Sequence, residues 1–401
     1  MNTHQYIDLE HKYSAHNYHP LPVVLSRGEG PYVWDVEGKR YLDFLSGYSA
    51  VNQGHCHPRL INTLVEQAGK LTLTSRAFHS DKLGEYAEFI TNYFGYGKVL
   101  PMNTGVEAVE TAIKITRKWG YEVKGIPDGQ AKIVVCEHNF HGRTSTVVSF
   151  STDPTARAHF GPYMPGFITI PYNDVSALEA ALEDSNVAGF LVEPIQGEAG
   201  VVVPDEGYLA KCKSLCEKKR VLFMADEIQT GLGRTGKMLA CDHEGVRPDV
   251  LILGKALSGG LLPISAVLTD NEVMDCIHPG EHGSTFGGNP LACAVAMEAL
   301  KVIQEEGLME NAANLGELLR AGIRSLNSPM ISLVRGKGLL NAIVINDPNP
   351  DAAWDLCLRM KNNGLLAKPT HGDKIRFAPP LVITQTQVED AIGIIKGSLE
   401  S

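Results

Sequence analysis

The fold prediction rests on two stretches of sequence, VLFMADEIQTGLGRTG at residues 221–236 and PDVLILGKALSGG at residues 248–260. Each contains a short apolar run that ends at a residue capable of chemistry, Asp226 in the first and Lys255 in the second. Short runs of this kind, separated by helical stretches, are typical of buried parallel strands. Ligands bind at the carboxyl ends of such strands, so we expect both residues at one site.

The same pattern continues on both sides of these stretches. Further buried parallel strands are predicted for KIVVCE (132–137), GFLVEP (189–194) and SAVLTD (265–270). The second of these runs ends at Glu193, which adds a third candidate at a strand end. Apolar residues recur at helical spacing over 81–94 and 106–118, which predicts helices between the strands.

The chain changes character near residue 305. Predicted helices near 308–326, 352–363 and 386–399 alternate with ISLVRG, LLNAIVI and KIRFAP, which favours a smaller α+β unit. At the other end, PYVWDV and KRYLDF flank Glu37-Gly38 and predict a β-hairpin. We therefore predict an α/β protein in three parts: an N-terminal segment with a hairpin (1–47), a large domain with a mostly parallel sheet flanked by helices (48–305), and a small α+β domain (306–401).

Composition narrows the classes of partner. The 401 residues include 36 Lys and Arg against 46 Asp and Glu, a net charge of −10. Such a balance disfavours nucleic acid or an anionic membrane as the main partner. The longest apolar stretch, VLILGKALSGGLLPISAVL, is interrupted by Lys255, glycines and Pro263, so no membrane span is expected.

Cysteine usage and the N-terminal sequence indicate a reducing compartment. The eight cysteines are dispersed without a CxxC pair, which predicts neither a disulfide framework nor a zinc module. The first residues, MNTHQYIDLEHKYSAHNYHP, lack the apolar core of a signal peptide and the Arg-rich character of a transit peptide. We expect a cytoplasmic protein.

Lys255 is the residue with the sharpest chemical implication. Burial at a strand end lowers the pKa of a lysine, and a neutral amine can form a Schiff base with a carbonyl. Asp226 at a neighbouring strand end can pair with the protonated pyridine nitrogen of pyridoxal phosphate. The segment Asn103-Thr104-Gly105-Val106 opens a predicted helix, and N–H groups at a helix start suit a phosphate. The alternatives are a lysine that reaches the surface and an ordinary structural or capping aspartate.

Two other motifs are weaker. GLGRTG at 231–236 matches GxGxxG formally, but five residues separate it from the strand and two of them are acidic, which disfavours a dinucleotide. His55-Cys56-His57 has no matching second set of ligands, so we expect a turn there and no metal site.

The motifs together resemble the class III aminotransferases, pyridoxal-phosphate-dependent enzymes of fold type I. The class is indicated by the two stretches quoted first and by HGSTFGGNPLACA. The branch that acts on ornithine is indicated by AHNYHPLPVVL, YSAVNQGHCHP, NTGVEAVETAIK, NFHGRT and VEPIQGEAGVVVP. The resemblance implies transfer of the δ-amino group of L-ornithine to 2-oxoglutarate, giving glutamate 5-semialdehyde, which cyclises to pyrroline-5-carboxylate, and glutamate.

The resemblance also implies roles around the cofactor ring. Lys255 would attach the cofactor covalently and move the proton between substrate and cofactor. Asp226 would hold the pyridine nitrogen and Gln229 the ring hydroxyl. Phe140 would stack on the ring.

For the phosphate, the resemblance implies backbone contacts from Gly105 and Val106. It also implies a contact from Thr285 of the neighbouring subunit, so that the enzyme would be a homodimer with shared active sites.

Five further residues are implied at the substrate. Tyr18 and Arg143 would hold the α-carboxylate end of ornithine, and Tyr48 would line the pocket. Arg376 would bind the α-carboxylate of glutamate or 2-oxoglutarate, with Glu198 as its exchangeable partner. From the residues alone, structural ion pairs, a surface acid and a packing tyrosine remain alternatives.

Other functions stay open at this point. An aminotransferase for N-acetylornithine or 4-aminobutyrate would share Lys255, Asp226 and Arg376. A pyridoxal-phosphate mutase or decarboxylase on the same fold, or a catalytically silent binding protein, are more distant alternatives.

Overall fold

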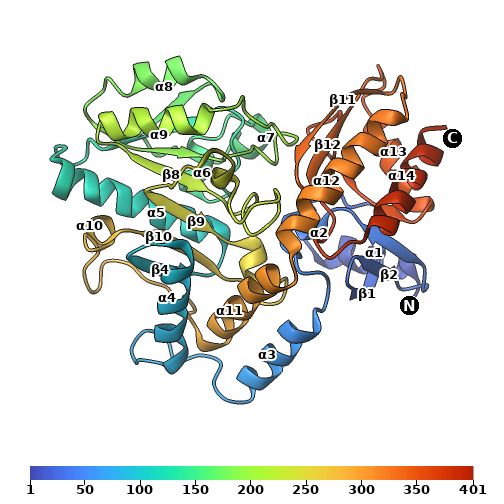
Figure 1. Cartoon of the computed structure of the whole chain (residues 1–401), viewed down its shortest axis with the longest axis horizontal. Coiled ribbons are helices and arrows are strands. Elements are labelled where there is room, and N and C mark those ends of the chain that lie inside the picture. Colours follow the sequence, from blue (N-terminus) through green and yellow to red (C-terminus); the bar gives the residue numbers. More distant parts are fainter. Residues whose placement is uncertain (401) are drawn as a thin grey trace.

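The predicted strands form the central sheet of the larger of two lobes. The computed structural model describes residues 1–400 and places this lobe, whose sheet is drawn from teal to yellow, beside a smaller lobe that contains the dark-blue N-terminal and the red C-terminal segments (Figure 1). The sheet has seven strands in the order β4-β10-β9-β8-β7-β5-β6. Along the sheet these are Lys98–Met102, Ser265–Thr269, Val250–Leu253, Leu222–Asp226, Val187–Val192, Lys132–Cys136 and Phe167–Ile170.

The prediction of a mostly parallel sheet is confirmed, but the prediction for SAVLTD is wrong in direction. Strands β9, β8, β7, β5 and β6 run parallel, whereas β10 is antiparallel to both of its neighbours, β9 and β4. Only residues 254–264 join β9 to β10, and they contain just the short 3₁₀ helix η3 (Lys255–Ser258). A parallel return needs a crossover of a dozen or more residues, so the chain turns back instead.

Both faces of the sheet are covered, which explains why its strands are apolar throughout. Along β8, Met224 belongs to the core under helix α5 (Gly105–Trp119), while Phe223 belongs to the core on the opposite face. Helices α8 (Val175–Ala181) and α9 (Tyr208–Lys218) cover that opposite face (Figure 1). Successive side chains of a strand point to opposite faces, so a strand buried on both sides has no polar alternation.

The remaining helices of the large lobe surround this sheet. Helix α4 matches the prediction for 81–94, and it packs against α11 and the edge strand β4. The other elements are α3 (Pro58–Ala68), α4 (Asp81–Phe94), η1 (Gly120–Lys124), α6 (Ser145–Ser149), α7 (Pro154–Arg157), η2 (Ala240–Glu244), α10 (Asn271–Met274) and α11 (Pro290–Glu305).

The smaller lobe combines the two ends of the chain. The predicted hairpin is present as β2 and β3, which form a four-stranded sheet with β1 and, in parallel, β13. A second sheet has the antiparallel order β11-β12-β15-β14. The elements are α1 (Thr3–Tyr13), β1 (Leu25–Glu29), β2 (Tyr32–Asp35), β3 (Arg40–Asp43), α12 (Leu308–Ser325), β11 (Ile331–Lys337), β12 (Leu340–Ile345), α13 (Ala352–Asn362), β13 (Leu365–Leu366), β14 (Lys368–Thr370), β15 (Lys374–Phe377) and α14 (Gln385–Glu400).

The helices and strands predicted after residue 305 are therefore present. The boundaries at residues 47 and 305 stay a prediction. Within residues 1–400, no helix is both long enough and apolar enough to cross a bilayer.

One turn has an uncommon conformation. The segment α2 (Ser46–Ser49) winds in the left-handed sense, with φ between 51° and 70° at all four residues. Only Gly47 adopts this conformation at little cost, and each L-residue costs about 1–2 kcal/mol there. Strained backbone of this kind persists only where surrounding contacts hold it, which makes the position of Tyr48 in this turn notable.

Candidate active site

Lys255 follows β9 after one residue, Gly254, at the carboxyl edge of the sheet. It is half-buried, and its backbone is left-handed with a φ of 44°. Within residues 1–400, its amine has no hydrogen bond and no ion pair. Burial lowers the pKa of Lys255; the charge of Glu198 opposes this shift and that of Arg376 adds to it. A lysine with a lowered pKa and a free amine is suited to attack a carbonyl or to accept a proton.

Asp226 ends the neighbouring strand β8 and is buried. Its Oδ2 atom lies 2.6 Å from Nδ1 of His141, and its Oδ1 atom accepts a hydrogen bond from the Ile228 N–H at 3.1 Å. Burial lowers the pKa of His141, but the hydrogen bond and charge of Asp226 outweigh it, so the pKa of His141 is raised. The carboxylate is therefore held in place by a buried histidine and a backbone N–H.

The sequence prediction did not assign a role to His141. The available signal was its place one residue after Phe140, in the loop that follows β5. Its Nε2 atom is buried and has no hydrogen-bond partner within residues 1–400.

Glu193 fixes the loop that carries Phe140. Its Oε1 atom accepts a hydrogen bond from the Phe140 N–H at 2.8 Å. Burial raises the pKa of Glu193 to about 7, against the opposing charge of His141. Phe140 is half-buried, and the Arg143 guanidinium lies 5.4 Å from the centre of its ring.

The start of α5 faces the same edge of the sheet. Thr104 caps the helix, and Glu107 completes a capping box by accepting from the Thr104 N–H at 2.6 Å. The next two N–H groups, those of Gly105 and Val106, have no acceptor within residues 1–400. A Cβ atom at Gly105 would lie 3.1 Å from the Ile228 side chain, so glycine allows this close approach to the β8 loop. Unpaired N–H groups at a helix start form an anion site.

A buried ion pair lies close enough to Lys255 for its charges to act on the pKa of the amine. Arg376 in β15 is 2% exposed, and its Nη1 atom donates to Oε1 of Glu198 at 2.8 Å. Gln229 lies between them: its Nε2 donates to Glu198 Oε1 at 3.1 Å, and its Oε1 accepts from Arg376 at 3.3 Å. Burial raises the pKa of Glu198, but the charges of Arg376 and Lys255 and the hydrogen bonds from Arg376 and Gln229 together outweigh burial and lower it to about 2.

Gly197 is a second residue that the sequence prediction missed. A Cβ atom at this position would lie 1.4 Å from Gln229 Oε1. No pattern in the sequence distinguishes Gly197 from any other loop glycine, because Gln229 lies 32 residues away along the chain.

Tyr48 connects this ion pair to the other predicted substrate residues. Its ring lies 5.1 Å from the Arg376 guanidinium. Burial raises the pKa of Tyr48, and the charges of Glu198, Arg376, Tyr18 and Arg143 add smaller effects of either sign. Tyr18 and Arg143 are exposed, so they lie at the outer side of this group.

Thr285 is not part of this group within the chain. It is exposed in the loop between α10 and α11, and it makes no hydrogen bond within residues 1–400. Its neighbour Ser284 accepts a hydrogen bond from Asn103 Nδ2 at 2.7 Å, which places the loop beside the start of α5.

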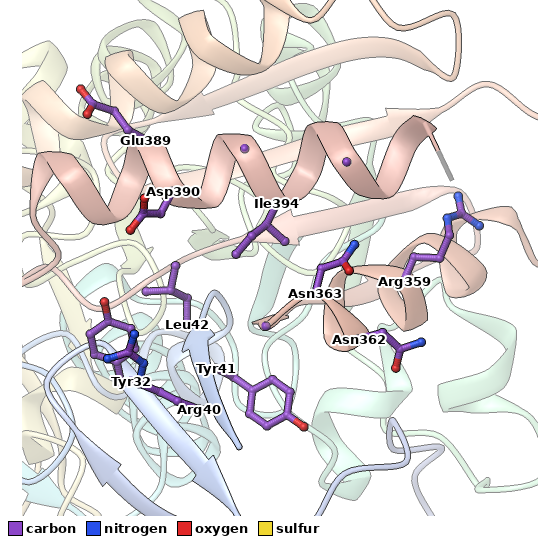
Figure 2. Close-up of a pocket in the computed structure, with 13 residues that line it drawn as sticks. Tyr32, Arg40, Tyr41, Leu42, Arg359, Asn362, Asn363, Glu389, Asp390 and Ile394 are labelled. Carbon is purple, nitrogen blue, oxygen red and sulfur yellow. The ribbon is translucent and has the colours of Figure 1, made fainter. Parts of the chain in front are cut away.

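Of two cavities in the protein, only the smaller is lined by predicted site residues. A cavity of about 790 Å³ is lined by Phe140, His141 and Glu198 and opens beside the group. A larger hollow of about 950 Å³ lies in the smaller lobe between α14, the end of α13 and the β2–β3 hairpin, lined by Arg40, Arg359 and Asp390 (Figure 2). The larger one contains none of the predicted site residues, so size alone does not identify the site.

The chemical groups at this site are those that pyridoxal phosphate requires. It offers an amine without a partner, a buried carboxylate supported by a histidine, an aromatic ring and two free N–H groups at a helix start. Within residues 1–400, no group of three or more His, Cys, Asp or Glu side chains is placed to hold a metal ion.

Comparison with known proteins gives consistent matches. The family described as aminotransferase class-III matches residues 13–399. The mitochondrial ornithine aminotransferase of Drosophila melanogaster is 64% identical over 98% of this chain and 90% of its own length. An ornithine aminotransferase structure from Toxoplasma gondii, described with partial occupancy of PLP at its active site, is 51% identical with a TM-score of 0.98, covering 100% of this chain and 94% of its own. A structure described as acetylornithine aminotransferase from Elizabethkingia anophelis is 60% identical with a TM-score of 0.92, covering 100% and 99%.

Proposed function

The chain belongs to the class III aminotransferase family, and from this membership we propose that it is a pyridoxal-phosphate-dependent ornithine aminotransferase. It transfers the δ-amino group of L-ornithine to 2-oxoglutarate. The products are glutamate 5-semialdehyde, which cyclises to pyrroline-5-carboxylate, and glutamate.

The cofactor would be held by the groups already described. When bound, pyridoxal phosphate supplies an electron sink that stabilises negative charge on the substrate carbon. Lys255 provides the attachment point, Asp226 the partner for the pyridine nitrogen, and the N–H groups of Gly105 and Val106 the phosphate site. Phe140 and Gln229 complete the set at the ring face and the ring hydroxyl.

Lys255 also moves the proton at the reacting carbon. Burial lowers the pKa of Lys255 and so favours its neutral amine, which is the form that accepts a proton. His141 Nδ1 lies 2.6 Å from Asp226 Oδ2, so the position of this carboxylate depends on the histidine as well.

The observation that carries the proposal is the Glu198–Arg376 pair beside Lys255. An arginine that binds an α-carboxylate would also capture that of ornithine and present the wrong amine to the cofactor. Glu198 occupies Arg376 at 2.8 Å and prevents this. When glutamate or 2-oxoglutarate enters, its own carboxylate replaces Glu198, so that a buried arginine never stays unpaired.

The outer residues would then hold the far end of ornithine. Arg143 and Tyr18 are exposed, on the outer side of Tyr48, where a free α-amino acid end can remain hydrated while its carboxylate is bound. Tyr48, whose ring lies 5.1 Å from the Arg376 guanidinium, would line the pocket between these residues and Arg376.

The active form is a homodimer with shared sites, in which Thr285 reaches the phosphate of the other subunit. Thr285 and the neighbouring Phe286, which is 55% exposed, support a surface that a second copy covers. Mixing a Lys255→Ala chain with a Thr285→Ala chain tests this, because some heterodimers should regain one intact site. No recovery in heterodimers shown to form would contradict sharing.

We also propose that the protein is cytoplasmic. The Drosophila relative, by contrast, is named as a mitochondrial enzyme. Cell fractionation followed by an activity assay tests it.

The second candidate is an N-acetylornithine aminotransferase, favoured by the name of the 60% identical Elizabethkingia structure. The test is a coupled assay of 2-oxoglutarate with ornithine, N-acetylornithine or 4-aminobutyrate as donor. The proposal expects kcat/KM for ornithine to exceed that of either alternative by at least about tenfold, since a charged α-amino acid end should fit the Arg143 side of the pocket. A preference for the acetylated donor would overturn it.

A further inference from the structure

The GLGRTG segment contains a buried arginine that the mechanism above does not use. Arg234 is 0% exposed, and it forms no ion pair within residues 1–400. Burial lowers its pKa to about 9, and the charge of Asp43 opposes this only in part. Burying a cation without a carboxylate partner is costly, so its hydrogen bonds must serve a strong structural purpose.

Those hydrogen bonds join the large lobe to the strands that carry Arg376. Arg234 Nη1 donates to the carbonyl oxygen of Leu339 at 3.0 Å and to that of Pro379 at 2.6 Å. Leu339 immediately precedes β12, and Pro379 follows the end of β15 by two residues. These strands are paired, with Ala342 opposite Arg376. The guanidinium therefore closes the end of the strand pair that holds Arg376.

The other side of the guanidinium reaches the segment after Tyr48. Arg234 Nη2 donates to Asn52 Oδ1 at 2.5 Å. Asn52 in turn donates to the Leu232 carbonyl at 2.9 Å and accepts from the Leu381 N–H at 2.8 Å. Asn52 lies three residues after the left-handed turn, so the same cation restrains both sides of the contact between Tyr48 and Arg376.

The backbones at this junction also approach closely. The Leu339 N–H donates to the Arg234 carbonyl at 3.0 Å. A Cβ atom at Gly338 would lie 2.3 Å from the Thr235 carbonyl carbon. The glycines of the junction thus permit contact between two lobes, which gives GLGRTG a role unrelated to any dinucleotide.

We propose that Arg234 is a positioning residue for the α-carboxylate site, which holds Arg376 and Tyr48 in register with the strand that ends at Asp226. The inference rests on the proposed function, since it assigns the α-carboxylate of glutamate or 2-oxoglutarate to Arg376. A lysine cannot take over this role, because one ammonium group does not reproduce the planar fork that spans Leu339, Pro379 and Asn52.

The test compares Arg234→Lys with Arg320→Lys in the cofactor-loaded enzyme. Arg320 is also buried, at 7% exposure, and donates to the Gly338 carbonyl at 2.8 Å, but its hydrogen bonds stay within the smaller lobe. The half-reactions with glutamate and with ornithine are followed separately by cofactor absorbance, and thermal unfolding midpoints are recorded.

For Arg234→Lys, we expect KM for glutamate and for 2-oxoglutarate to rise by at least about tenfold, while KM for ornithine changes by less than about threefold. Arg320→Lys should change KM for glutamate, 2-oxoglutarate and ornithine by less than about threefold, even if its unfolding midpoint falls. An equal rise in KM for glutamate and ornithine in Arg234→Lys, or no rise in either, would overturn the proposal.

If Arg234→Lys does not yield folded protein, Asn52→Ala provides the test, because it removes one acceptor and leaves both carbonyl contacts. The same selective rise in KM for glutamate is expected, and an unchanged glutamate-to-ornithine ratio would overturn the proposal. Failure of the parental enzyme to use ornithine would overturn the proposed function alone, since the glutamate half-reaction still reports on Arg376.

Discussion

Replacing Gly197 with alanine should change how the protein distinguishes its two amino donors. The new Cβ atom would lie 1.4 Å from Gln229 Oε1 and 2.5 Å from its Cδ atom, whereas its distance to Cγ, 3.4 Å, is ordinary. The clash therefore falls on the flexible end of the Gln229 side chain. The amide has to move, and the backbone does not.

The cost follows from the hydrogen bonds that the displaced amide gives up. It loses the bond to Glu198 at 3.1 Å and the longer one from Arg376 at 3.3 Å. A hydrogen bond to a charged group contributes about 1.5–3 kcal/mol, and we take the lower value for Glu198. About 1.5 kcal/mol corresponds to roughly a tenfold change in an equilibrium, so Glu198 should leave Arg376 about ten times more readily.

The assay measures the two half-reactions of Gly197→Ala by single-turnover absorbance. The ratio of kcat/KM for glutamate to that for ornithine should rise by about tenfold, and some ornithine should react at its α-amine. Disturbance of a cofactor contact by Gln229 would affect both donors alike, so the ratio isolates the effect on the ion pair.

Gly84→Ala serves as the control, because a Cβ atom at this position in α4 meets no atom within 4 Å. An unchanged ratio in folded, cofactor-loaded Gly197→Ala would refute the idea that the Gln229 amide restrains the Glu198–Arg376 pair.

Three further predictions concern the charged groups of the site. Lys255→Ala should keep the fold and lose turnover; substantial activity without added amine would contradict the assignment. Glu198→Ala should leave Arg376 buried and unpaired, lower the unfolding free energy by about 3–5 kcal/mol, and yield the α-keto acid of ornithine on product analysis; formation of only the δ-product would exclude a switch. Burial raises the pKa of Glu193 from 4.5 to about 7, so the folded protein binds this proton more tightly than the unfolded chain and loses stability as pH rises from about 4.5 to 7. The thermal unfolding midpoint of Glu193→Gln should therefore exceed that of the parent above pH 7 and equal it below pH 4.5. A difference in midpoint that does not depend on pH would contradict a raised pKa at Glu193.

The strand-end part of the site was predictable from sequence because its signal is local. A run of four or five apolar residues followed by Asp226 or Lys255 indicates both the strand and the reactive end. Strands β4 and β6 were missed because polar or strand-breaking residues interrupt their apolar runs: Lys98 and Pro101 in β4, and Thr169 in β6. The direction of β10 was mistaken because the runs show burial but not which way a strand points.

The residues proposed to bind substrate could not be predicted from local sequence patterns. Arg376 and Glu198 are 178 residues apart, and neither KIRF nor GEAG shows any sign of the other. Those assignments came from the resemblance to a family. The roles of His141, Gly197 and Arg234 depend on contacts between distant segments, which a single sequence does not record.

Charged residues from both lobes, Glu198 and Arg376, act on the pKa of the Lys255 amine. Glu198 raises the pKa of Lys255 and Arg376 lowers it, although the role that we propose for both is substrate recognition. An evolving lineage that exchanged either residue to accept another donor would therefore also retune the proton acceptor. Selection for a new substrate would then act on two properties at once, and exchanges that remove Glu198 and Arg376 together would leave the field at Lys255 less disturbed than either change alone.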